Sequence, residues 1–235
     1  MSSMYEILQG LPLFKGTSID QISSFLEKTH VEFRNHHPGD VIAREGEQCG
    51  YIKYVISGAV RKTTRVCDGL ALTEEILGPG SVLMPTHLFG LITSYPAHVE
   101  SIEEGSLMLI RKDQYFELLN SDPIFVLNFV NYLSYHAQMR LKSLLNFRGG
   151  SLEQWLKTLR QGVLESHFVE SRIHTSAQDI AHMLGMGEDD LRRQLAELRD
   201  KGAINYRVSP TRPDRSLWER RGHPSDLEIH LHSSL

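Results

Sequence analysis

The stretch from Thr175 to Ile204 constrains the fold of this chain more than any other segment, because it predicts two short amphipathic helices around a tight glycine turn. Thr175 is a candidate cap for the first helix, Gln178 would complete a capping box, and Gly185 ends that helix. Gly187 can cap the second helix, which would bury three leucines at helical spacing: Leu191, Leu195 and Leu198. This layout predicts a helix-turn-helix, whose second helix enters the major groove of DNA. A helical hairpin in a protein core is the alternative.

Length and composition describe an ordinary globular chain that is large enough for two domains. Its 235 residues are 40% hydrophobic and 23% charged, and no apolar run approaches the ~20 residues of a membrane span. The N-terminal sequence lacks the basic start and apolar core of a signal peptide. The two cysteines, Cys49 and Cys67, are too few for a disulfide framework or a four-thiolate iron–sulfur cluster. We therefore expect a cytoplasmic protein with no membrane partner.

The net charge of −4 does not favour avid binding to nucleic acid, but the charges are distributed unevenly. Residues 1–147 contain 12 Lys/Arg and 16 Asp/Glu, whereas residues 199–221 contain seven basic and three acidic side chains. The basic segment is therefore either a phosphate-contacting patch or a solvated loop.

Periodicity along the chain predicts an α+β fold. Residues 1–30 have apolar side chains at helical spacing, whereas residues 31–110 form short alternating runs between glycine turns. Such runs are typical of an antiparallel β-roll. Asp122 and Pro123 then supply a cap and a first helical residue for a helix to about Asn146, roughly 24 residues or ~36 Å long.

An apolar stripe along this long helix predicts a dimerisation seam. Its members recur every three or four positions: Val126, Val130, Leu133, Ala137, Leu141 and Leu144. The alternative is a helix that packs only on its own domain. We favour the seam because the stripe is longer than a small β domain.

Beyond the long helix, residues 147–150 break the pattern and predict an interdomain hinge. Ser151 and Gln154 form another capping box. Residues 203–208 and 227–232 read as two strands that would complete a winged helix. The predicted domains are a β-roll sensor domain at 1–120, a dimerisation helix at 121–147 and a winged helix-turn-helix at 148–235.

This order of elements resembles the cyclic-AMP receptor protein / fumarate-nitrate-reduction regulator (Crp/Fnr) family of bacterial transcription factors. In the first domain the resemblance depends on four motifs: Pro38-Gly39-Asp40, Glu45-Gly46, Ile56-Ser57-Gly58-Ala59-Val60-Arg61 and Leu77-Gly78-Pro79-Gly80. In the second it depends on the segment from Thr175 to Ile204. The resemblance implies a cyclic-nucleotide-binding-domain-like jelly roll and a homodimer that binds a pseudo-palindromic operator.

The resemblance does not extend to the cyclic-nucleotide ligand. Members that bind it have Gly-Glu-Leu after the Pro-Gly turn and Arg-Ser further on, but here Pro85 replaces the Glu, and Tyr95 and Pro96 replace Arg-Ser. No cation is left for the phosphate, and Pro96 has no amide hydrogen to donate. We therefore expect no binding of cyclic AMP in the usual way. The effector pocket predicted from this region consists of Met84, Thr86, His87, Leu88, Tyr95 and Ala97, and core filling is the favoured alternative for its apolar members.

The identity of the effector stays open. Iron–sulfur sensing is not expected, because the oxygen-sensing members use four cysteines. Haem is one candidate, because the chain has 12 histidines and one axial ligand can suffice. The candidate ligands are His87, His98 and His136. An apolar small molecule, or regulation without any effector, also fits the sequence.

The resemblance also implies which residues read DNA. The family's recognition helix carries a Glu and, four residues on, an Arg, and the matching positions are Asp189 and Arg193. The Arg would read guanine O6 and N7, and the acid would accept from cytosine N4. The other candidate contacts are Arg192, Gln194, Thr175, Ser176 and Gln178. The acids at 188–190 suit the helix dipole but oppose approach to phosphates.

These features favour a homodimeric transcription regulator with double-stranded DNA as its partner and RNA polymerase as an open further partner. The alternatives are a haem-based or other small-molecule sensor regulator and an interaction protein that has lost specific DNA binding. An enzyme is not expected, because the chain has no Gly-rich phosphate loop or nucleophile elbow. His230 and His232 share a strand face but lack a third ligand, so no metal site is predicted.

Overall fold

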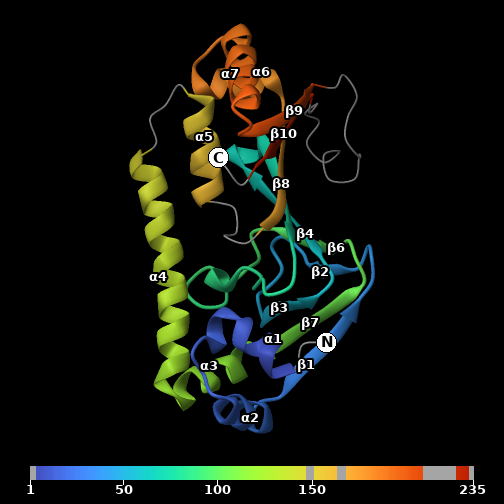
Figure 1. The fold of residues 1–235 in the computed structure, drawn as a ribbon, viewed down its shortest axis with the longest axis vertical. Helices are drawn as coiled ribbons and strands as arrows, with labels where there is room; N and C mark the ends of the chain where they lie inside the picture. The colour runs from blue at the N-terminus through green and yellow to red at the C-terminus, as the bar shows by residue number, and fades with distance from the viewer. Residues whose placement is uncertain (1–3, 147–150, 163–167, 209–225, 233–235) are drawn as a thin grey trace. The chain divides into compact units, whose positions relative to one another are not determined.

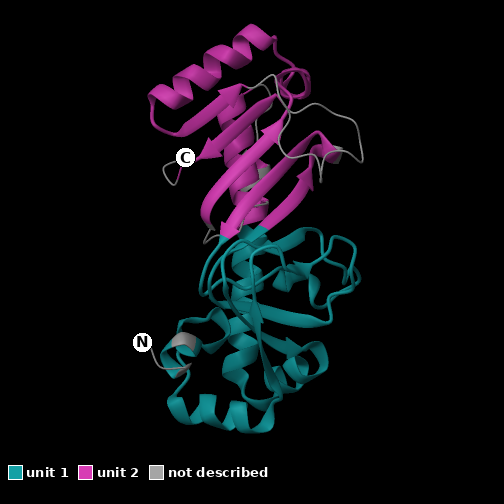
Figure 2. Ribbon diagram, turned by 90° about the vertical axis from the view of Figure 1, so that its right-hand side faces the viewer, with its two compact units in different colours: residues 1–61, 77–138 teal, residues 62–76, 139–235 magenta. Residues whose placement is uncertain are grey.

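The computed structural model describes residues 4–146, 151–162, 168–208 and 226–232 (Figure 1). The chain forms two compact units (Figure 2). Unit 1 consists of Met1–Arg61 and Leu77–Gln138, and unit 2 of Lys62–Ile76 and Met139–Leu235. The chain therefore passes between the units at 61/62, at 76/77 and at 138/139. The hinge predicted at 147–150 lies outside the described residues.

Unit 1 contains the antiparallel strands expected for the first half of the chain, with helices before and after them. Its helical segments are α1 (Met4–Gly10), the 3-10 turns η1 (Pro12–Phe14) and η3 (Pro85–His87), α2 (Ile19–Lys28), α3 (Lys112–Ser121) and most of α4 (Pro123–Asn146). Its strands are β1 (Val31–His36), β2 (Val41–Ala43), β3 (Tyr51–Ser57), β6 (His98–Ser101) and β7 (Gly105–Arg111). Strands β1, β7 and β3 form one sheet in that order, with Val31 opposite Ile110, and β2 pairs with β6.

The long helix α4 begins and ends as predicted. Asp122 Oδ1 accepts a hydrogen bond from Ile124 N at 2.9 Å, Pro123 is the first helical residue, and the helix runs for 24 residues. Its inner face packs on unit 1, where Phe125 meets the ring of Phe14 at 5.9 Å and Phe129 meets Tyr115 at 5.5 Å. In the described ranges, no helix is long and apolar enough to cross a membrane.

Unit 2 combines a hairpin from the first half of the chain with the C-terminal region. The hairpin consists of β4 (Val60–Val66), the turn η2 (Cys67–Gly69) and β5 (Ala71–Leu77). The other elements are α5 (Leu152–Gly162), β8 (Phe168–Thr175), α6 (Ala177–Leu184), α7 (Glu188–Asp200), β9 (Ile204–Val208) and β10 (Leu227–Leu231). The strand order is β4-β5-β8-β10-β9. The two strands predicted at 203–208 and 227–232 are confirmed as β9 and β10, and they pair with each other in an antiparallel arrangement.

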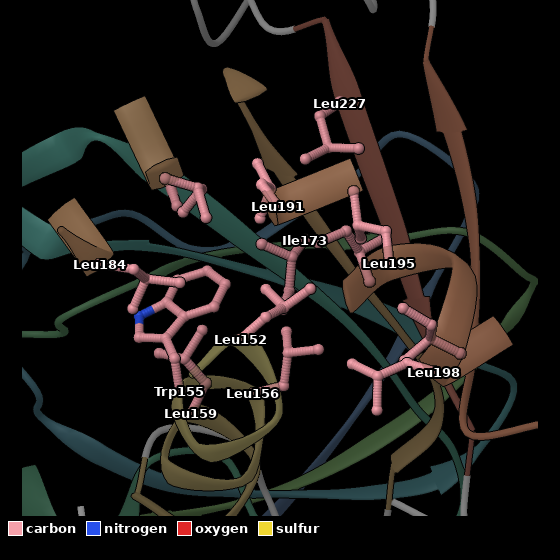
Figure 3. Close-up of a cluster of buried hydrophobic side chains, with 14 of the residues drawn as sticks. Leu152, Trp155, Leu156, Leu159, Ile173, Leu184, Leu191, Leu195, Leu198 and Leu227 are labelled. Carbon is pink, nitrogen blue, oxygen red and sulfur yellow. The ribbon is translucent and has the colours of Figure 1, made fainter. Parts of the chain in front are cut away.

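A single apolar core joins the three helices of unit 2 to its sheet (Figure 3). The predicted inner face of α7 is confirmed, because its three leucines are 0 to 3% exposed. The remaining members are Ala71, Leu152, Trp155, Leu156, Leu159, Ile173, Ile180, Ala181, Leu184, Ile204, Leu227, Ile229 and Leu231. Ala71 stands out, because it comes from the hairpin and not from the C-terminal region.

The capping box predicted at the start of α6 is wrong. Ser176 caps the helix, and its Oγ accepts from Asp179 N at 3.3 Å. Thr175 cannot serve as the cap because it is the last residue of β8, where it pairs with Leu227. Strand β8 itself was not predicted, and its buried residues, Ser171, Ile173, His174 and Thr175, are mostly polar and give no apolar alternation.

Candidate nucleic-acid interface and effector pocket

The turn between α6 and α7 fixes the direction of both helices. Gly185 adopts a left-handed backbone with φ 67°, which favours glycine, and Met186 N donates to Ala181 O at 2.9 Å. Gly187 then precedes α7 without a side-chain cap. Because the leucines of α7 are anchored in the core, the opposite face of this helix is presented to solvent by a rigid support.

Two arginines dominate this outer face of α7, and each is paired with an acid of its own helix. The side chains of Arg192 and Arg193 are 68% and 66% exposed. Arg193 Nη2 lies 2.6 Å from Asp190 Oδ1, and Arg192 Nη2 lies 3.5 Å from Glu188 Oε2. Exposed pairs of this kind contribute at most ~1 kcal/mol, so a phosphate or a guanine can displace the carboxylate. Asp189 is also exposed, but the acid that meets Arg193 is Asp190.

Gln194 has a structural position. Its side chain is half-buried, its Oε1 accepts from Leu152 N at 2.9 Å, and its Nε2 donates to Met186 Sδ at 3.6 Å. Gln194 therefore ties α7 to the start of α5 and to the turn before α7. Its side chain is not exposed on the outer face with Arg192 and Arg193.

The three candidate phosphate contacts before and in α6 lie in different surroundings. Thr175 is fully buried, and its Oγ1 donates to Leu70 O at 2.9 Å. Ser176 is half-buried and caps α6, whereas Gln178 is exposed. Gln178 is thus the one of the three that faces solvent freely.

The basic segment predicted at 199–221 is described only in part, because residues 209–225 lie outside the described ranges. Arg199 lies over the ring of Tyr206, 5.7 Å from its centroid, and its guanidinium is 3.2 Å from Asp200 Oδ1. Lys201 and Arg207 are exposed. These three residues are exposed or ring-stacked cations at the end of α7 and on β9, whereas the start of α7 is acidic.

The predicted effector pocket consists largely of core side chains of unit 1. The exposed fractions of its apolar members are 3% or less, and these residues are Met84, Leu88, Tyr95 and Ala97. Thr86 and His87 are half-buried, and Thr86 Oγ1 lies 3.0 Å from His87 Nδ1. Met84 has a left-handed backbone with φ 47°, a conformation that costs an ordinary residue about 1 kcal/mol or more.

A buried cation that the two motifs do not include lies beside Tyr95. Lys53 on β3 is 7% exposed, and its Nζ lies 4.7 Å from the ring centroid of Tyr95 and donates to Ile42 O at 2.5 Å. Burial lowers the pKa of Lys53. The sequence contained one signal for this cation, which is a lysine inside the apolar segment YIKYVIS. Both faces of β3 are largely buried, so a lysine in the middle of this strand is buried as well.

Cys49 and Tyr95 complete this cluster inside the roll. Tyr95 donates its hydroxyl to Tyr51 O at 3.3 Å, and burial raises the pKa of Tyr95. Cys49 is 1% exposed, and burial raises the pKa of its thiol. Lys53, Tyr95 and Cys49 therefore form a buried polar cluster inside the roll.

The candidate haem ligands are dispersed over unit 1 and all are half-buried. The rings of His136 and Tyr132 are tilted by 48° with their centroids 4.4 Å apart, and His98 lies 4.0 Å from Glu100. In unit 2, His230 hydrogen-bonds Glu228 and lies 3.5 Å from Glu170. No group of three or more metal-ligating side chains occurs in the described part of the chain.

The predicted seam on α4 is largely uncovered. Val126, Val130 and Leu141 are 40%, 49% and 57% exposed. Ala137 is also exposed, Leu133 is half-buried, and the side chain of Leu144 lies outside the described residues. This stripe is distinct from the inner face that carries Phe125 and Phe129, so α4 has two apolar faces and the fold covers one of them.

Comparison with known proteins places these features in a family context. Residues 33–122 match the family model of the cyclic nucleotide-binding domain. The anaerobic regulatory protein of Bacillus subtilis (strain 168) is 25% identical over 168 residues, which cover 69% of this chain and 71% of that protein. The matched range includes the hairpin residues 62–76, which the structure places in unit 2.

Solved structures of similar proteins include a bacterial activator and a sensor domain. The catabolite activator protein of Thermus thermophilus is 20% identical, with 94% of this chain and 93% of that chain covered and a TM-score of 0.46. The sensor domain of the transcriptional regulator DNR from Pseudomonas aeruginosa is 21% identical, with 58% and 90% covered and a TM-score of 0.48.

Proposed function

We propose that the chain is a member of the Crp/Fnr family of transcription regulators, which it resembles, and that it binds double-stranded DNA as a homodimer and regulates transcription. The observation that carries this proposal is the outer face of α7, where Arg192 and Arg193 stand in solvent on a helix whose inner face is locked in the core. In this proposal α6 and α7 are a helix-turn-helix, β9 and β10 are its wing, and α7 enters the major groove. The predicted domains of 1–120, 121–147 and 148–235 stay part of this proposal, although Lys62–Ile76 and the end of α4 from Met139 fall in unit 2.

The uncovered stripe of α4 supports the homodimer. An apolar helix face this long is unfavourable in water and fits a second copy of itself around a two-fold axis. Such an axis would present two copies of α7, one for each half of a pseudo-palindromic operator. The interaction with DNA and the pairing of the two copies therefore depend on different elements and can be tested separately.

Removal of the Arg193 guanidinium is expected to weaken specific binding most at one base position. Arg193→Ala should cost about 1–3 kcal/mol, or roughly 5- to 150-fold in Kd, because a bidentate contact to guanine is lost. Fluorescence anisotropy with a duplex that the wild type selects from a random library measures this change. Arg199→Ala is the matched control, since Arg199 is an exposed arginine at the other end of the same helix. Equal losses in the two variants would contradict the assignment.

Cyclic AMP is expected neither to stabilise the protein nor to change its affinity for DNA. Pro85 and Tyr95 replace the family's contacts, and Lys53 is held by Ile42 O and the Tyr95 ring. A ligand at 100 times its Kd would add about 2.7 kcal/mol to the free energy of unfolding, which a thermal melt detects easily. A melt with and without cyclic AMP checks this, with a cyclic-AMP-binding regulator as positive control. A concentration-dependent rise in Tm would overturn the expectation.

The pairing of both arginines with acids favours one second candidate function, an interaction protein that has lost specific DNA binding. Glu188 and Asp190 neutralise the two cations in the free protein and lie where phosphates would approach. A mobility-shift assay over a range of salt concentrations discriminates between the two functions. A sequence preference with a linear log–log salt dependence supports the regulator, whereas binding without sequence preference, or no binding, supports the interaction protein.

A further inference from the structure

The hairpin Lys62–Ile76 belongs to unit 2, although the domain that the family model matches begins before it and continues after it. Strand β5 lies beside β8 in the unit 2 sheet, which continues as β10 and β9. Without the hairpin, β8 would be an edge strand with a row of unpaired backbone groups. Among the described strands of the C-terminal region, β10 and β9 lie on the other side of β8, so the hairpin alone pairs with this edge there.

Backbone pairing of β5 with β8 and several side-chain contacts seat the hairpin against this edge. Thr175 Oγ1 donates to Leu70 O at 2.9 Å. Ala71 is fully buried in the core of unit 2, and Val66 and Cys67 pack partly buried against it. His174 Nε2 on β8 lies 3.2 Å from Glu74 Oε2 on β5, and only 7% of the His174 side chain is exposed.

Polar groups of β8 at this junction are incompletely bonded. The buried hydroxyl of Ser171 has no hydrogen-bond partner among the described residues, and neither ring nitrogen of His174 makes an aligned hydrogen bond. The buried ion pair of Lys62 and Glu75, at 3.0 Å, lies within the hairpin itself and is not a contact with β8. The side chains of Ser171 and His174 lose their hydration without full compensation, which weakens the docking of the hairpin relative to an apolar core.

We propose that the edge of β8 is a strand-docking surface that the hairpin Lys62–Ile76 occupies reversibly, and that its occupancy sets the affinity of the C-terminal region for DNA. Release would break the contact of Thr175 with Leu70 and expose Ala71 and Cys67, while the leucine core around α5, α6 and α7 persists. Both ends of the hairpin continue into unit 1, so a change there can act on β8 through the backbone. The claim about DNA affinity rests on the proposed function, whereas the claim that the hairpin docks reversibly does not.

The two cysteines of the chain make the docking measurable in the full-length protein. Cys67 is half-buried at the tip of the hairpin, whereas Cys49 is 1% exposed inside unit 1, where burial raises the pKa of its thiol. Labelling with a disulfide reagent, mapped by mass spectrometry, should therefore report release of the hairpin at Cys67 and global unfolding at Cys49. Thr175→Val removes the hydroxyl that binds Leu70 O and keeps the shape of the side chain. Glu74→Gln removes the charge beside His174.

Both variants should raise the labelling rate of Cys67 by about two- to tenfold and leave Cys49 slow, because one hydrogen bond or ion contact of the docked state is lost. Glu170→Gln is the control, since Glu170 is on the same strand but pairs with Arg172 at 2.8 Å. Unchanged Cys67 rates in both variants would overturn the docking claim. A parallel rise at Cys49 would also overturn it, because the opening would then be global unfolding.

DNA affinity tests the second half of the proposal separately. With a duplex selected by the wild type, Thr175→Val should change the Kd at least about threefold relative to Glu170→Gln. Equal Kd values, combined with faster Cys67 labelling, would overturn the coupling and leave the docking intact. If the wild type selects no sequence, the proposed function fails, but the labelling result still decides whether the hairpin docks reversibly.

Discussion

A single carboxylate on the outer stripe of α4, introduced by Val130→Asp, is expected to convert the homodimer into monomers. Val130 is 49% exposed in the isolated chain, so the fold of one copy tolerates the charge. In a two-fold seam the change buries two unpaired carboxylates, one from each copy, close to one another. We expect a loss of about 3 kcal/mol or more, which is roughly a 100-fold rise in the dimer dissociation constant. Sedimentation velocity over a concentration series measures it.

Asn131→Asp is the matched control for this prediction. It adds the same charge at the neighbouring exposed position of the same helix, but outside the stripe. The control should dimerise like the wild type and bind DNA normally, whereas Val130→Asp should lose tight binding because one half-site contact is much weaker than two. A wild type that is monomeric at all concentrations, or two variants that dimerise equally well, would rule out the seam.

The second large effect is expected at Leu195, in the centre of the core beneath α7. Leu195→Ala should reduce the free energy of unfolding of unit 2 by about 2–5 kcal/mol, because a side chain 1% exposed is replaced by a cavity. Trp155 belongs to the same core, so urea titration followed by tryptophan fluorescence and far-UV circular dichroism measures the change. Because this core orients the outer face of α7, DNA affinity should fall as well.

Val208→Ala is the control that shows whether the loss of stability depends on the burial of the truncated side chain. Val208 lies on β9 of the same unit and is 62% exposed, so its truncation should change the free energy of unfolding by less than about 0.5 kcal/mol. Equal destabilisation by the two variants would show that Leu195 is not part of a packed core. A stable Leu195→Ala protein with normal DNA binding would show that packing at Leu195 does not set the orientation of α7.

Local signals in the sequence were sufficient for most elements. The start of α4 follows from Asp122 and Pro123, and the end of α6 follows from Gly185, because caps and left-handed turns depend on residues adjacent in the chain. The inner face of α7 follows from leucine spacing. The strands of unit 1 likewise follow from alternation between glycine turns. In each case the physical cause of the element lies in residues that are close together in the sequence.

The contacts that set the surroundings of the candidate sites were decided by tertiary structure. Pairing with Leu227 makes Thr175 the end of a strand and leaves Ser176 as the cap. Lys53 reaches Tyr95 across the interior of the roll, and the hairpin Lys62–Ile76 joins a sheet whose other strands come from the far end of the chain. Such contacts join residues that are distant in sequence, and which of many polar partners meet depends on how whole elements pack. The sequence alone therefore determined the elements and the residue types available for binding DNA, and the tertiary structure determined which of those residues remain accessible.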